Sequence, residues 1–143
     1  MVTVLAAALL AHPAMAEIGR VKSSTGPATI VRGTTMIPAK PGVKLEPGDV
    51  VVTQKLGRVG IAFLDDTRFA IGPDSRIVMK EFIYDRPRQS GTFLTEVKRG
   101  SLGVVSGKIA KSGKDAMKVR TPTSMLGVRG TKFVVEVKGK GES

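Results

Sequence analysis

The chain has 143 residues, carries 23 Lys and Arg against 12 Asp and Glu, and contains no cysteine, so its formal net charge is +11. Without cysteine, the fold is held by burial and backbone pairing, and thiolate chemistry is excluded. The single histidine, His12, lies in the apolar N-terminal segment, so the usual acid–base catalysts and His/Cys zinc sites lack their residues. We therefore expect a protein that is not an enzyme, that holds no metal or cofactor, and whose charge favours anionic partners.

The first sixteen residues predict a secretory signal peptide. Val2 to Ala11 is an apolar run of about ten residues, half the length of roughly twenty that a membrane-spanning helix needs. A small-x-small site follows at Ala14-Met15-Ala16. The alternatives are a buried apolar strand or an uncleaved anchor. We expect cleavage after Ala16, a mature chain (17–143) that forms one domain without a transmembrane helix, and a periplasmic or secreted location.

After residue 16, glycine and proline recur at short intervals, and the runs between them alternate between apolar and polar residues, which is the pattern of short strands. The predicted strands are, in chain order, Ala28–Arg32, Val50–Thr53, Val59–Phe63, Phe69–Ile71, Arg76–Met79, Thr92–Val97, Leu102–Val105, Met117–Thr121 and Lys132–Val137. The fold class is therefore all-β, with little or no helix outside the signal peptide. Short antiparallel or solenoid-like strands would form an irregular β roll or sandwich, and a small barrel is a third option.

Two segments allow more than one interpretation. Val78 to Tyr84 would also suit a helical stripe, but Asp85, Pro87 and Gly91 follow at once, so we interpret it as a strand that runs into a loop. Gly100 to Gly113 carries regularly spaced lysines that would suit a short helix. Because glycine disfavours a helix by about 1 kcal/mol per position, we predict a strand followed by an exposed basic loop.

Two other sets of residues are candidates for chemical sites. Four aspartates could form a calcium-type site or bond the backbone of their own turns, and their Gly, Pro, Ser and Thr neighbours favour the turns: Asp49, Asp65, Asp66 and Asp74. Serine–lysine catalysis has formal candidates in a glycine-rich segment, where solvated turn residues are the better interpretation: Ser106, Lys108, Lys111 and Ser112.

The most sharply specified stretch is a glycine-flanked arginine turn between strands. We predict a structural turn made by Gly127, Arg129, Gly130, Thr131 and Phe133. Arg129 is expected to be half-buried, bonded to carbonyls or paired with Asp49 or Asp66, so that Arg129→Lys destabilises the fold. The alternative is a docking point for a carboxylate or phosphate group.

Basic residues crowd the second half of the chain. The candidate interaction face consists of Arg86, Arg88, Lys98, Arg99, Lys108, Lys111, Lys114 and Lys118, with Arg120 beside them. The alternative is a solvated, solubilising face. Nucleic acid is not expected as a partner, because aromatic residues make up only 4% of the chain. An anionic envelope polymer, lipid headgroups or an acidic protein patch suit the predicted location better.

Five motifs in fixed order resemble the FecR-type periplasmic domain. They are Pro47-Gly48-Asp49, Phe63-Leu64-Asp65-Asp66-Thr67, Gly72-Pro73-Asp74-Ser75, Lys98-Arg99-Gly100-Ser101-Leu102, and Thr121-Pro122 with Gly127-Val128-Arg129-Gly130-Thr131-Lys132-Phe133. The resemblance covers most of Val43 to Val137. It implies a β-rich periplasmic domain that receives a signal, as in membrane-spanning regulators of iron uptake.

The chain departs from that family plan in three ways. The membrane-spanning regulators have a cytoplasmic anti-sigma segment and one transmembrane helix before the periplasmic domain. Here a leader stands in place of the cytoplasmic segment and a transmembrane helix is not expected, so control of a sigma factor does not carry over. Asp66 stands where the family often has glycine, which requires Asp66 to adopt the left-handed conformation. The chain also ends at Ser143, where the family usually continues, so we expect a form truncated at its C-terminus.

The sequence therefore predicts a free-standing, exported, non-catalytic interaction domain for envelope sensing, signalling or scaffolding. The alternative function is a structural envelope protein that binds anionic polymers or lipid headgroups through the basic face. The ligand, the partner and the oligomeric state are not indicated.

Overall fold

The computed structural model describes residues 16–129 and 132–138. Of the expected signal peptide, only Ala16 lies within this part of the chain. The elements are β1 (Gly19–Thr25), β2 (Ala28–Arg32), β3 (Thr35–Pro38), β4 (Lys44–Leu45), β5 (Val50–Thr53), β6 (Arg58–Phe63), β7 (Arg68–Ile71), β8 (Arg76–Asp85), β9 (Ser90–Val105), α1 (Lys108–Ser112), β10 (Met117–Arg120), β11 (Met125–Val128) and β12 (Lys132–Val137). The all-β prediction is confirmed.

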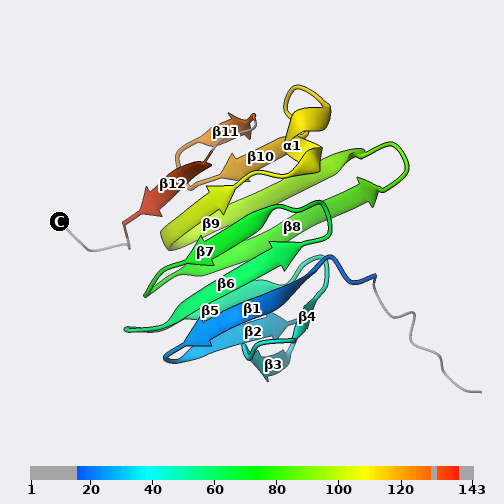
Figure 1. The fold of residues 1–143 in the computed structure, drawn as a ribbon. Coiled ribbons are helices and arrows are strands. Elements are labelled where there is room, and N and C mark those ends of the chain that lie inside the picture. Colours follow the sequence, from blue (N-terminus) through cyan, green and yellow to red (C-terminus); the bar gives the residue numbers. More distant parts are fainter. Residues whose placement is uncertain (1–15, 130–131, 139–143) are drawn as a thin grey trace, which may run out of the picture.

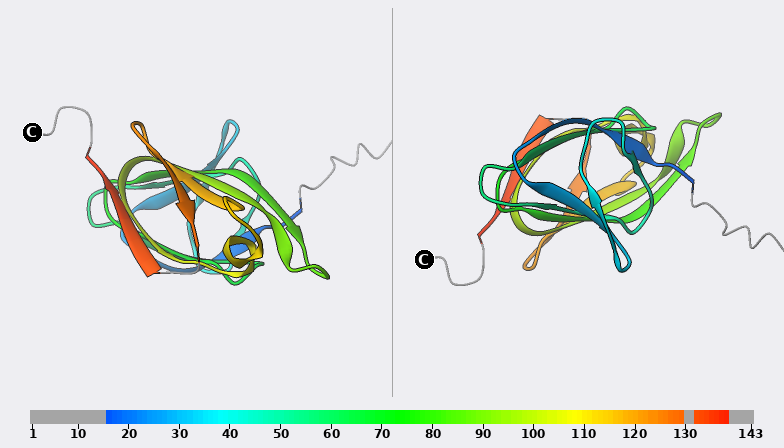
Figure 2. Two further views of the ribbon diagram at one scale, coloured as in Figure 1. Left: turned by 90° about the horizontal axis from the view of Figure 1, so that it is seen from above. Right: turned by 90° about the horizontal axis from the view of Figure 1, so that it is seen from below.

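The strands form one curled sheet that wraps around the core (Figures 1 and 2). Their order is β3-β2-β5-β8-β9-β7-β6-β1-β4, and β10, β11 and β12 join near β9. Within the described chain, β10 runs parallel to β9, and the other pairings are antiparallel. The two strands at the ends of this order, β3 and β4, are neighbours in the sequence. The sheet therefore curls far enough to bring its two ends together.

Strand β9 is the centre of this arrangement, because four strands pair with it. Its first half pairs with β8 and β10, and its second half pairs with β7 and β12. In the β8–β9 ladder, Arg76 lies opposite Arg99 but Ile77 lies opposite Val97, so Lys98 is an extra residue that forms a β-bulge. The bulge lets Lys98 and Arg99, which are adjacent in sequence, both reach the surface.

Aromatic rings fill the middle of the core. Phe93 lies in edge contact with Phe63 and Phe82, with ring centroids 4.8 Å apart in each pair, and Phe63 contacts Phe69 at 4.6 Å. Such contacts add about 0.5–1.5 kcal/mol each beyond burial. The predicted alternation of β6 is confirmed, since Val59, Ile61 and Phe63 are all buried. Strands β6, β8 and β9 are thereby fixed against one another.

The structure corrects two sequence predictions. Lys108 to Ser112 is a short helix, α1, where a basic loop was expected. The glycines that argued against a helix, Gly107 and Gly113, stand at its two ends and not inside it. The interpretation of Val78 to Tyr84 as a strand and not a helix is confirmed, but β8 continues past the predicted end at Met79 to Asp85, because β9 pairs with it along its whole length.

Four strands were not predicted, namely β1, β3, β4 and β11. Strand β1 has a weak pattern, with only Gly19 and Val21 buried among its seven residues. It is held instead by pairing with β6 on one side and β4 on the other. No helix in the described ranges is long and apolar enough to cross a membrane.

Candidate functional site

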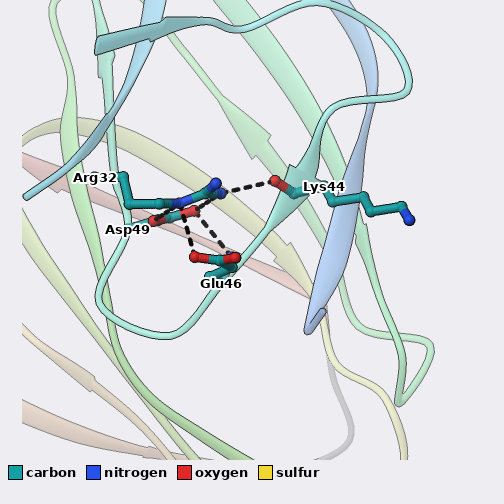
Figure 3. A network of polar contacts seen from close by, with 4 residues as sticks. All are labelled: Arg32, Lys44, Glu46 and Asp49. Atoms are coloured by element: carbon teal, nitrogen blue, oxygen red, sulfur yellow. Dashed lines mark hydrogen bonds and ion pairs between the residues drawn. The ribbon is translucent and has the colours of Figure 1, made fainter. Parts of the chain in front are cut away.

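A buried carboxylate anchors the place where the ends of the sheet meet (Figure 3). Asp49, only 1% exposed, accepts hydrogen bonds from Nε and Nη2 of Arg32 at 2.9 and 2.8 Å. The same Nη2 donates to the backbone carbonyl of Lys44 at 3.0 Å, and Glu46 forms an ion pair with Arg32 at 3.0 Å. The hydrogen bonds that Arg32 donates to Asp49 raise the pKa of Arg32, so this side chain stays charged where the ends of the sheet meet.

A second buried carboxylate, Asp65, organises the β6–β7 turn and the start of α1. Its side chain accepts hydrogen bonds from the Thr67 N–H at 3.1 Å, the Thr67 hydroxyl at 2.8 Å and the Ile109 N–H at 3.2 Å. Its backbone carbonyl accepts from the Lys108 N–H at 2.7 Å. Asp65 thus accepts hydrogen bonds from the first N–H groups of a helix that lies far away in the sequence and whose own N-cap residue, Gly107, has no side chain to do so. The turn interpretation of this aspartate is confirmed.

The other aspartates also serve turns. Asp66 has a φ of +71° and Asp74 a φ of +53°, so both adopt the left-handed conformation. This confirms that Asp66 takes the conformation for which the family often uses glycine. Asp49 adds to its Arg32 contacts a hydrogen bond from the Glu46 N–H at 2.9 Å, as expected for a Pro-Gly-Asp turn. In the part of the chain that the structure describes, three or more metal-binding side chains do not gather anywhere.

Glu96, on β9, gathers cations from three strands. Lys98 lies 2.7 Å from its carboxylate, Arg120 of β10 lies at 3.3 Å, and Lys80 of β8 lies at 4.0 Å. The hydrogen bond from Lys98 lowers the pKa of Glu96, desolvation opposes the shift, and the nearby charges of Lys98, Lys80 and Arg120 add to it. Lys98 and Arg120, which were placed in or beside the basic face, are therefore partly neutralised.

The eight residues of the predicted basic face lie on several different elements. Arg86 and Arg88 lie at the tip of the β8–β9 hairpin, Lys98 and Arg99 at the bulge, Lys108 and Lys111 on α1, Lys114 after it, and Lys118 on β10. Nine strand residues separate the hairpin tip from Arg99, which is about 30 Å. The structure thus brings Lys98 and Arg99 together and leaves Arg86 and Arg88 far from them. That all eight act as one surface stays a prediction.

At the bulge, a groove of about 770 Å³ opens between the β8–β9 ladder and β12. Four cations and two carboxylates line it: Arg76, Lys98, Arg99, Lys138, Asp74 and Glu136. Arg76 and Arg99 are exposed and lie directly opposite each other on neighbouring strands. Sequence reasoning missed Arg76, because only the register of the ladder reveals that it faces Arg99.

A buried network of hydroxyl groups holds the backbone next to the residues that line this groove. The Thr53 hydroxyl donates to the Gly72 carbonyl at 2.6 Å and accepts from the Ser75 N–H at 2.9 Å. The Ser75 hydroxyl in turn accepts from the Ser101 N–H at 3.0 Å. Since Thr53 and Ser75 are almost fully buried, these bonds fix the backbone on which Arg76 and Arg99 stand.

The predicted arginine turn is only partly described. Gly130 and Thr131 lie outside the described residues, so the turn itself stays a prediction. Arg129 is exposed rather than half-buried. The two partners expected for it are paired with other cations, Asp66 with Lys108 at 3.3 Å and Asp49 with Arg32 at 2.8 Å. Phe133 is half-buried on β12. Gly127 lies in β11, where an added Cβ would meet the side chain of Asp115.

Comparison with known proteins places the chain in a family. The family model described as FecR protein matches residues 49–143, which begin at the buried Asp49 and include Asp65, Glu96 and the bulge. A search of curated proteins and a search of solved structures each gave no match. Strands β1 to β4 precede the matched region, yet β1 pairs with β6 and β2 with β5 in the same sheet. Because the match covers well over half of the sequence and agrees with the five ordered motifs, the chain belongs to the FecR family.

Proposed function

We propose that this protein is an exported, non-catalytic FecR-type domain that takes part in envelope signalling by binding another envelope protein. Membership of the FecR family supports an envelope signalling role. The non-catalytic part of the proposal is supported by the hydrogen bonds and ion pairs of the buried carboxylates. Asp49, Asp65 and Glu96 are each bound by groups of the chain itself, so they serve the scaffold. Recognition therefore falls to exposed side chains.

The signalling role is tested by comparing transcripts in cells that lack the protein, cells that produce it, and cells that produce a destabilised variant. We expect a discrete set of envelope-related genes to change when the protein is lost and to recover when the full chain is restored. Identical transcript profiles in all three strains, under conditions in which the protein is made, would remove the signalling proposal.

A second candidate is a structural envelope protein that binds anionic polymers or lipid headgroups. The formal charge of +11, with several exposed lysines and arginines, favours it. Binding of this kind is electrostatic and is screened by salt. Retention on an envelope preparation that is equally strong at low and high ionic strength would exclude it, whereas a specific protein partner survives the salt wash.

A further inference from the structure

We propose that the groove at the β8–β9 bulge binds a phosphate ester that carries neighbouring hydroxyl groups, with Arg76 and Arg99 as the phosphate ligands. This inference goes beyond the proposed function and does not depend on envelope signalling. It rests on three features: two opposed arginines, the buried hydrogen bonds that hold their backbone, and two carboxylates in the same groove.

The opposed arginines are unfavourable for the fold itself. Like charges directly opposite on neighbouring strands destabilise a sheet. Within the described residues, neither Arg76 nor Arg99 takes part in an ion pair, whereas the adjacent Lys98 is held by Glu96 at 2.7 Å. An anion bound between the two guanidinium groups would remove this repulsion. A bulge that places charge in this way is a common feature of binding sites.

The buried hydroxyl network fixes the backbone that carries the two arginines. Gly100 follows Arg99 and has a φ of +91°, which turns β9 so that the Ser101 N–H reaches the Ser75 hydroxyl. Ser75 is the residue before Arg76 and is fully buried. The backbones of both arginines are therefore fixed to each other through one side chain, so the entropy cost of binding falls on the two arginine side chains and not on the backbone.

The number of donors favours phosphate over carboxylate. One guanidinium group can satisfy both oxygens of a carboxylate through two parallel hydrogen bonds. Two guanidinium groups that face each other offer twice as many donors, and a phosphate monoester, with about −1.5 to −2 charges and three free oxygens, can accept from both. A lysine cannot replace either arginine, because its ammonium is a point charge without the planar donor pair.

The two carboxylates indicate what surrounds the phosphate. Asp74 and Glu136 line the same groove and can accept hydrogen bonds from hydroxyl groups. They would repel an acidic peptide, which would bring further carboxylates. A sugar phosphate or glycerol phosphate satisfies both requirements. It can come from a soluble or polymeric envelope component with a terminal phosphate, or from a lipid headgroup that ends in a phosphate monoester, such as phosphatidylglycerol phosphate.

The binding test is a titration of the purified protein with glycerol 1-phosphate, followed by NMR of the backbone amides. We expect shifts centred on residues 75–76 and 99–101, and an affinity at least about tenfold higher than for gluconate, a hydroxylated carboxylate. The double variant Arg76→Gln with Arg99→Gln should lose about tenfold or more in affinity, and Arg99→Lys alone should lose nearly as much.

The matched control is the double variant Arg86→Gln with Arg88→Gln, which removes the same charge at the hairpin tip. It should keep the wild-type affinity within about twofold, because its effect is only long-range and screened. An equal loss in both double variants would show non-specific charge attraction and overturn the proposal. Equal affinity for gluconate and glycerol 1-phosphate would also overturn it, as would amide shifts confined to other elements.

Thermal unfolding shows whether the double variant at Arg76 and Arg99 loses affinity without losing its fold. Removing the Arg76–Arg99 repulsion should leave the melting temperature of the double variant equal to or above that of the wild type. Vesicles that contain phosphatidylglycerol phosphate then identify the source of the phosphate, with vesicles of phosphatidylglycerol, whose phosphate is a diester, as the control. Vesicle binding that depends on the arginine pair supports a lipid headgroup, and binding of glycerol 1-phosphate alone supports a soluble or polymeric ligand.

Discussion

Arg32 holds the carboxylate of Asp49 with two hydrogen bonds, 2.9 and 2.8 Å long, at the point where the curled sheet meets itself. Arg32 ends β2, next to one end of the strand order, and its Nη2 also reaches the Lys44 carbonyl of β4, at the other end. One guanidinium group thus joins two edges that the strand ladders do not connect. This is the internal arginine clamp that the sequence suggested at Arg129, formed by a different arginine.

Arg32→Lys should therefore lower the free energy of unfolding by about 1–3 kcal/mol, because an ammonium cannot donate to both oxygens of the buried Asp49 and to the Lys44 carbonyl together. Arg129→Lys is the matched control, and since Arg129 is exposed, its effect should stay within about 0.5 kcal/mol. Urea unfolding measures both. The clamp is wrongly assigned if the two variants unfold at the same urea concentration.

Asp65→Ala should be among the most damaging single substitutions, with a loss of about 3 kcal/mol. It leaves the Thr67 and Ile109 N–H groups and the Thr67 hydroxyl without their acceptor in a buried site. Asp66→Asn, one residue away and exposed, should be nearly neutral because asparagine also tolerates a φ of +71°. Circular dichroism should show a lower melting temperature for the first variant only. Equal melting temperatures would mean that Asp65 does not cap α1.

Gly100→Ala and Gly48→Ala form a matched pair that isolates the close approach at the bulge. Both glycines have positive φ, +91° and +86°. A Cβ at Gly100 would overlap the backbone and side chain of Ser75, whereas a Cβ at Gly48 meets nothing within 4 Å. Both variants should lose about 1–2 kcal/mol from backbone strain, and Gly100→Ala should lose about 1–3 kcal/mol more. Chemical denaturation would contradict this expectation if the Gly48→Ala variant had the lower free energy of unfolding of the two.

Glu96 should make stability depend on acid pH. Its pKa is lowered, chiefly by the hydrogen bond from Lys98, so the folded state holds the charged form more strongly than the unfolded chain does. The resulting stabilisation is complete above the ordinary glutamate value of 4.5 and is lost as the pH falls through the lowered pKa. Glu96→Gln should therefore be less stable than the wild type at pH 7, and the difference should shrink on acidification. A constant difference between pH 7 and pH 3 would refute this contribution.

The local sequence pattern predicted the strands that have clear alternation and flanking turns. Ala28–Arg32, Val50–Thr53 and Lys132–Val137 match β2, β5 and β12 at both ends, because alternation and flanking turns define them. Strands β1 and β4 could not be found in this way. They are short or weakly alternating and exist because distant strands pair with them, β1 with β6 across about forty residues of sequence. The first N–H groups of the helix α1 bind Asp65, which is equally remote.

The same limit applies to the candidate site. Lys98 and Arg99 were recognised as basic, and Asp49 was recognised as a partner for a buried arginine. Which arginine meets Asp49 depends on how far the sheet curls, and that Arg76 faces Arg99 depends on a one-residue bulge. Charge and turn chemistry can be read along the chain, whereas the pairing of charges follows from register.

The most direct test of the central claim, that this FecR-family protein acts by binding another envelope protein, is crosslinking of the full chain in intact cells that produce it. Mass spectrometry of the adducts should identify one envelope protein whose yield persists after a wash at about 1 M salt, where the Debye length is about 3 Å. Arg32→Lys, measured in parallel, should reduce that adduct only as far as it reduces the folded fraction. Adducts that contain only the chain itself, or anionic polymer that the salt removes, would contradict the claim.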